Sequence, residues 1–169
     1  MLILDIRTAG KKAKTVIEKL KINRLTLVLA ESCTCGLVSS LLAKTPGVSS
    51  VFWGSYICYK QEAKVSMLDL DNDKLEKEGL VCCETASSMA CMALQKSGAD
   101  IAASVTGLAG PGTDGRAKVG TVFIAVIFKG GQVKTFEYHF TGSRNKIRYR
   151  AAIKVMEAIL EVFPEPLKS

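Results

Sequence analysis

Apolar side chains recur every three or four positions in three long stretches of the chain, residues 9–20, 84–96 and 147–162. That spacing places them on one face of an amphipathic helix. Lysines fill the intervening positions of the first stretch, and Gly98 follows the second as a stop signal. We therefore expect three surface helices, together with two shorter ones at 36–42 and 64–70.

Short apolar and β-branched runs lie between these helical patterns. Residues 25–30 and 101–105 are almost continuously apolar, as in strands buried on both faces, and residues 51–59 are rich in aromatic and β-branched types. Residues 121–128 and 133–140 flank a short glycine-containing segment typical of a hairpin turn. Strands that alternate with helices predict an α/β fold in three layers, α/β/α, around a mixed, mostly parallel sheet.

Length and composition narrow the class of protein. A chain of 169 residues, 48% of them hydrophobic, is the usual size of one globular domain, so we expect residues 1–169 to form a single domain. No apolar run reaches the roughly 20 residues of a membrane helix, and the first residues lack the order of a signal peptide. We expect a cytoplasmic protein.

The cysteines and the net charge say less about function than the length and composition do. In a cytoplasmic protein the six cysteines are expected as free thiols, and the absence of a C-x-x-C pair beside a single histidine argues against a metal. The net charge of +7 favours anionic partners, but the lysine-rich first helix has no interleaved aromatic residues. A nucleic-acid partner is therefore the weakest expectation.

Candidate chemistry lies where segments follow predicted strands, because ligands of α/β sheets gather at the carboxyl ends of strands. Ser32 passes from a strand into a helix, where backbone N–H groups can stabilise an anion. Helix capping by Ser32 or Thr34 explains the same pattern equally well. A nucleophilic serine needs a base, and the candidates for that base are Lys64 and His139.

Two further segments carry weaker signals. The glycine-rich turn 106–112 lets the backbone approach a ligand, or is only a loop. The start of the last helix carries four cations, whose charge opposes the helix dipole. An anionic ligand at that position or plain solubility accounts for them. These cations are Arg144, Lys146, Arg148 and Arg150.

Several motifs in order resemble the C-terminal domain of the competence-damage-inducible protein CinA, a family that includes the stand-alone nicotinamide-nucleotide amidase PncC. The segment A-E-S-C-T at 30–34 is close to the family's A-E-S-C-T-G-G, and Y-K-Q-E-A-K at 59–64 is similar to Y-S-N-E-A-K. The likeness continues through P-G-V-S-S-V-F at 46–52, G-L-A-G-P at 107–111, V-G-T-V at 119–122 and G-S-R at 142–144. It extends from about residue 17 to residue 163.

The resemblance implies hydrolysis of the carboxamide of nicotinamide mononucleotide, giving the nicotinate nucleotide and ammonia without metal or organic cofactor. It implies Ser32 as nucleophile, Lys64 as general base and Tyr59 as a proton relay or orienting group. It also implies a homodimer. The residues expected to bind substrate are Glu31, Cys33, Thr34, Thr106, Gly107, Ala109, Gly110 and Arg144.

The chain departs from the family pattern at several positions beside these residues. Cys35 replaces the first glycine of the G-G pair, and Lys60 and Gln61 replace S-N. The loop 113–118 is shorter than usual and lacks a proline, and Ser143 stands where an acidic residue is common. The departures bear on substrate preference. A non-catalytic nucleotide-binding or regulatory module and an amidase for another small amide are the alternatives.

Overall fold

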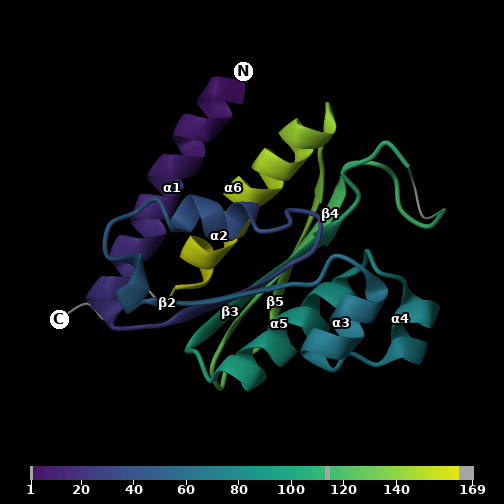
Figure 1. The fold of residues 1–169 in the computed structure, drawn as a ribbon, viewed down its shortest axis with the longest axis horizontal. Helices are drawn as coiled ribbons and strands as arrows, with labels where there is room; N and C mark the ends of the chain where they lie inside the picture. The colour runs from purple at the N-terminus through teal and green to yellow at the C-terminus, as the bar shows by residue number, and fades with distance from the viewer. Residues whose placement is uncertain (1, 113–114, 164–169) are drawn as a thin grey trace.

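A five-stranded sheet forms the centre of the computed structural model, which describes residues 2–112 and 115–163 and, among these, the side chains from Ile6 onward (Figure 1). The strand order is β2-β1-β3-β4-β5, with two parallel pairs (β2–β1 and β1–β3) and two antiparallel pairs (β3–β4 and β4–β5). The expected mixed α/β architecture is confirmed, although parallel pairs do not outnumber antiparallel pairs as expected. The strands are β1 (Leu27–Glu31), β2 (Phe52–Ile57), β3 (Ile101–Gly107), β4 (Thr121–Phe128) and β5 (Lys134–His139).

Helices cover both faces of the sheet (Figure 1). One face carries α1 (Leu2–Asn23), α2 (Leu37–Leu42) and α6 (Arg144–Val162), and the other carries α3 (Gln61–Leu68), α4 (Asn72–Glu78) and α5 (Cys83–Ser97). Alternate residues of β1 divide between the two cores, because successive strand side chains point to opposite faces. Leu27 and Leu29 join the first core, and Val28 and Ala30 join the second.

Most expected elements are present, with two differences on the α3–α5 side. Helix α3 begins at Gln61 rather than at residue 64, directly after the extended Lys60. Helix α4 is absent from the expectations, because its seven residues are polar apart from the buried Leu75. Its N-cap residue is Asp71, whose side chain accepts a hydrogen bond from the Lys74 N–H at 3.1 Å.

The strand register decides which loops meet. Glu31 at the end of β1 pairs with Ile57 of β2 and Val105 of β3. Beyond the strands, the Ser32 N–H donates to the Val105 carbonyl at 2.9 Å and the Cys58 N–H donates to the Glu31 carbonyl at 2.8 Å. The segments after β1, β2 and β3 therefore begin side by side at one edge of the sheet.

Three expectations from the sequence concern membrane helices, cysteines and the loop 113–118. None of the helices that the structure describes is long and apolar enough to cross a membrane. All six cysteines are free thiols. The expectation about the shortened loop concerns 113–118, of which 113 and 114 lie outside the described residues.

Candidate active site

The structure brings Ser32 and Lys64 together although they are far apart in the sequence. Helix α3 directs Lys64 inward, where the Lys64 Nζ lies 3.1 Å from the Ser32 Oγ and 2.9 Å from the Cys58 carbonyl oxygen. The side chain of Lys64 is 1% exposed and Ser32 is 6% exposed. A hydroxyl within hydrogen-bond reach of an amine is the geometry that a serine nucleophile and its base require.

Burial makes Lys64 a suitable base. Desolvation lowers the pKa of the Lys64 amine, because the charged form loses its hydration inside the protein. No carboxylate of the described residues forms an ion pair with Lys64. A lysine that is buried without a counter-ion is poised to accept a proton at lower pH than a surface lysine.

The turn after Ser32 is not organised as a serine or threonine cap. Helix α2 has Gly36 as its N-cap residue, without a side-chain cap. The Glu31 carboxylate instead accepts hydrogen bonds from the N–H groups of Val38 (3.2 Å) and Ser39 (2.9 Å), and from the Ser39 hydroxyl (2.5 Å). The capping interpretation of Ser32 and Thr34 is therefore wrong, since Glu31 has that role.

The same turn contains two backbone N–H groups that have no backbone carbonyl acceptor among the described residues. The Ser32 N–H is used by Val105, and the Cys35 N–H donates to the Ser32 carbonyl at 3.0 Å. Within the described residues, the N–H groups of Cys33 and Thr34 donate to no backbone carbonyl. Backbone donors directly after a nucleophile are the usual components of an oxyanion hole.

Tyr59 and Arg144 meet at the rim of the site. The Arg144 guanidinium donates to the Tyr59 hydroxyl and to the Gly110 carbonyl, both at 2.6 Å. Arg144 thus joins the loop after β2 to the turn after β3. The described contacts of the Tyr59 hydroxyl include neither Ser32 nor Lys64. The tyrosine is 48% exposed, and its role toward a substrate stays a prediction.

The remaining residues expected to bind substrate shape the turn after β3. The Thr106 hydroxyl donates to the Leu80 carbonyl at 2.7 Å, and Ala109 is buried. Gly107 is required by close approach, because a Cβ there would lie 2.7 Å from the Thr121 carbonyl oxygen. Their contact with substrate stays a prediction.

Two cysteines flank the turn with different properties. Burial raises the pKa of the Cys33 thiol to about 12, so it stays protonated beside Ser32 and does not compete as a nucleophile. Cys35 is exposed and has φ of +50°, in the left-handed region that favours glycine. The glycine that the family resemblance places at this position suits the turn better than the cysteine does.

His139 is not the base of Ser32. Its ring nitrogens lie 3.3 Å from the Thr121 hydroxyl and 3.1 Å from a Glu137 carboxylate oxygen, on β4 and β5. Sequence reasoning also missed one contact of the turn. Arg148 of α6 donates to the Thr34 carbonyl at 2.6 Å, which a pattern of helix cations does not reveal.

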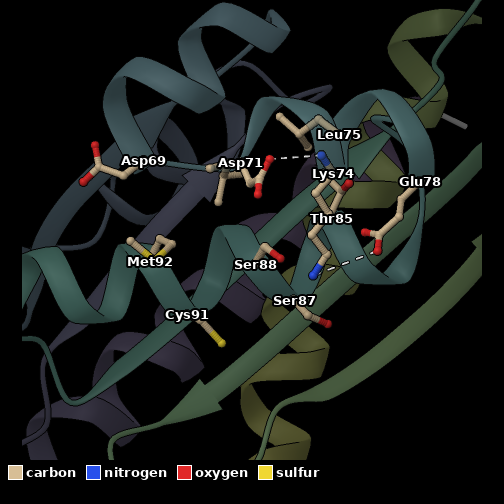
Figure 2. Close-up of a pocket in the computed structure, with 11 residues that line it drawn as sticks. Asp69, Asp71, Lys74, Leu75, Glu78, Thr85, Ser87, Ser88, Cys91 and Met92 are labelled. Atoms are coloured by element: carbon tan, nitrogen blue, oxygen red, sulfur yellow. Dashed lines mark hydrogen bonds and ion pairs between the residues drawn. The ribbon is translucent and has the colours of Figure 1, made fainter.

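A separate cavity of about 340 Å³ lies between α4 and α5, on the face opposite α2 and α6 (Figure 2). Its wall contains apolar side chains and three carboxylates, those of Asp69, Asp71 and Glu78. Neither Ser32 nor Lys64 borders it. This cavity is therefore separate from the candidate site formed by Ser32 and Lys64.

The chain is similar to known proteins in both sequence and fold. A CinA-like protein of Thermotoga maritima is 41% identical over 148 residues, which are 87% of this chain and 36% of that protein. The competence/damage inducible protein CihA of Agrobacterium tumefaciens has a solved structure with a TM-score of 0.88 at 31% identity, covering 91% of this chain and 94% of that one. A CinA superfamily protein of Escherichia coli gives 0.88 at 26% identity, covering 92% of this chain and 90% of that one.

The chain spans about a third of the length of the curated relatives it matches. Residues 9–163 match the family described as the CinA C-terminal domain. This range contains the Ser32 turn, Lys64, the turn after β3 and nearly all of the sheet and its covering helices. The chain belongs to the CinA C-terminal domain family.

Proposed function

We propose that this protein hydrolyses the carboxamide of nicotinamide mononucleotide, giving the nicotinate nucleotide and ammonia. The observation that carries the proposal is the 3.1 Å contact between the Ser32 hydroxyl and a buried lysine amine that has no carboxylate partner among the described residues. A serine and a lysine in this arrangement suit acyl transfer, in which the amine removes the hydroxyl proton.

The first half of the reaction forms an acyl-enzyme. The Ser32 Oγ attacks the carboxamide carbon while neutral Lys64 takes the hydroxyl proton. The N–H groups of Cys33 and Thr34 stabilise the oxyanion of the tetrahedral intermediate. The carbon–nitrogen bond then breaks, Lys64 returns its proton to the nitrogen, and ammonia leaves.

The second half releases the product. Lys64 removes a proton from water, which attacks the acyl carbon and forms a second tetrahedral intermediate. Collapse of this intermediate breaks the bond to the Ser32 Oγ, and the proton on Lys64 returns to that oxygen. We assign Tyr59 to orienting the substrate together with Arg144, because its hydroxyl is hydrogen-bonded to that guanidinium.

The test is ammonia release from nicotinamide mononucleotide, with a chelator present. Wild type and Ser50→Ala are expected to turn over alike, because Ser50 is exposed and its hydroxyl, among the described residues, bonds only to the Gly47 carbonyl. Ser32→Ala is expected to be inactive. Wild-type protein that binds the nucleotide without releasing ammonia would contradict the proposal and favour a binding module.

A further inference from the structure

The guanidinium of Arg148 reaches from the second turn of α6 to the turn that carries Ser32. Its Nη2 donates to the Thr34 carbonyl at 2.6 Å. Thr34 is fully buried, and its carbonyl also accepts a hydrogen bond from the Leu37 N–H at 3.3 Å. Helices α2 and α6 pack side by side on the same face of the sheet (Figure 1).

The peptide between Thr34 and Cys35 is held at both ends. Arg148 binds its carbonyl, and its N–H, that of Cys35, donates to the Ser32 carbonyl at 3.0 Å. A peptide unit is planar, so fixing both groups fixes its orientation. The neighbouring N–H groups of Cys33 and Thr34 are the donors left for an oxyanion, and their direction depends on this peptide.

Within the described part of the chain, Arg148 makes this contact without a counter-ion. No carboxylate of the described residues pairs with it, and its Nε is buried without a hydrogen-bond partner. Partly buried cations of this kind cost free energy, particularly in the first turns of a helix. Arg150 also donates to a backbone carbonyl, that of Thr141, but on the exposed surface.

From these contacts we infer that Arg148 is a positioning residue that fixes the oxyanion-binding turn through the Thr34 carbonyl. The inference rests on the proposed function of Ser32 as a nucleophile. It differs from a role in binding an anionic ligand directly, which the cluster of cations at the start of α6 first indicates. A positioning role changes kcat, and a ligand contact changes KM.

The experiment compares Arg148→Met, Arg148→Lys and Arg150→Met in the full chain, by ammonia release and by labelling with a fluorophosphonate. In the labelling reaction the Ser32 oxygen forms a bond to phosphorus, fluoride leaves, and Lys64 takes the hydroxyl proton. The phosphoryl oxygen occupies the oxyanion position, so the labelling rate reports on the turn without any amide substrate.

We expect Arg148→Met to lower kcat and the labelling rate roughly 10- to 100-fold, because small displacements of catalytic groups have effects of this size. KM is expected to stay within twofold. Arg148→Lys, which keeps one donor and the charge, is expected to recover part of the loss. Arg150→Met is expected to match wild type in both assays.

Three results would overturn the inference: unchanged kcat and labelling in Arg148→Met, a loss expressed only in KM, or an equal loss in Arg150→Met. If Arg148→Met does not fold, labelling of Arg148→Lys at the wild-type rate would likewise contradict it. A wild type that labels at Ser32 but releases no ammonia would refute the proposed function, while the labelling rates would still test Arg148.

Discussion

Lys64 and Lys154 end in the same amine but occupy opposite environments. Lys64 is buried at the sheet edge, where desolvation lowers its pKa and its contacts are a hydroxyl and a carbonyl. Lys154 lies on the outer face of α6, 2.9 Å from the Glu157 carboxylate, and this hydrogen bond raises its pKa. Burial without a carboxylate partner among the described residues thus gives Lys64 the lowered pKa that the proposed general base requires.

The largest expected effect of this difference is on activity. Lys64→Met removes the base and is expected to lower kcat about 10²- to 10⁴-fold for nicotinamide mononucleotide. Lys154→Met leaves the reacting atoms untouched and is expected to stay within twofold of wild type. Ammonia release measures both variants. Equal rates for wild type and Lys64→Met would contradict the assignment of the base.

The second expected effect is on pH dependence. Only neutral Lys64 accepts the Ser32 proton, so kcat/KM is expected to rise about tenfold per pH unit below the pKa of Lys64 and to level off above it. Desolvation lowers the pKa of Lys64, so kcat/KM is expected to level off below about pH 10.4, the ordinary pKa of lysine. Rate profiles of wild type and Lys154→Met are expected to coincide. A flat profile in both would contradict the prediction.

A third effect concerns stability. A lowered pKa means that folded Lys64 binds fewer protons than the unfolded chain, so its contribution is unfavourable at low pH and improves as pH rises toward about 10.4. Lys64→Met is therefore expected to raise the free energy of unfolding by about 1 kcal/mol at neutral pH, or roughly 3 °C in Tm. The gain is expected to shrink with increasing pH in thermal unfolding. A large loss of stability would show that Lys64 is structural.

A fourth effect separates the turn from the lysine. Cys35→Gly removes the steric strain of a side chain on left-handed backbone. Once the larger entropy of the unfolded chain is subtracted, it is expected to stabilise the protein by about 0.5–1 kcal/mol. Denaturant unfolding measures this change. The pH profile of kcat/KM is expected to keep its midpoint, because Lys64 is untouched. A shifted midpoint would show that the turn sets the pKa of Lys64.

The smallest effect is expected at the surface. Lys154→Met is expected to cost at most about 0.5 kcal/mol, since exposed ion pairs contribute little. The pKa of Lys154 is raised, so its effect on stability has the opposite pH dependence to that of Lys64. Lys154 stabilises the folded protein below about pH 10.4, and this contribution is lost as the pH rises through the raised pKa. Unfolding at several pH values tests this. A contribution from Lys154 that grows with pH would contradict it.

The sequence predicts the fold well where apolar periodicity is strong and less well where it is weak. The expected strand at 121–128 coincides with β4, whereas the polar helix α4 depends on one buried leucine and an aspartate cap and was not expected. Helix α3 was expected to begin at residue 64 and begins at Gln61, because its first residues Gln61–Ala63 carry no distinctive pattern.

The site was predictable to a different extent. The local sequence around Ser32 fits a helix cap and a nucleophile equally well. Only the family resemblance connects Ser32 with Lys64. The deciding contacts join residues 32 or more positions apart, such as Lys64 with Ser32 and Arg148 with Thr34. Such contacts depend on strand order and helix packing, which residue spacing does not specify. Glu31 as the cap of α2 was missed for a different reason, because it lies seven and eight positions before the N–H groups of Val38 and Ser39 and not at the N-cap position.

The pKa of Lys64 can be observed by an NMR titration of lysine side chains labelled at the ε-carbon, with Lys64→Met assigning its signal. We expect one signal to titrate below the surface lysines, to be absent from Lys64→Met and to persist in Lys154→Met. That result would establish a neutral amine beside the Ser32 hydroxyl at a pH where other lysines are charged. If Lys64 titrates together with the surface lysines, it is not the base, and the Ser32–Lys64 mechanism is wrong.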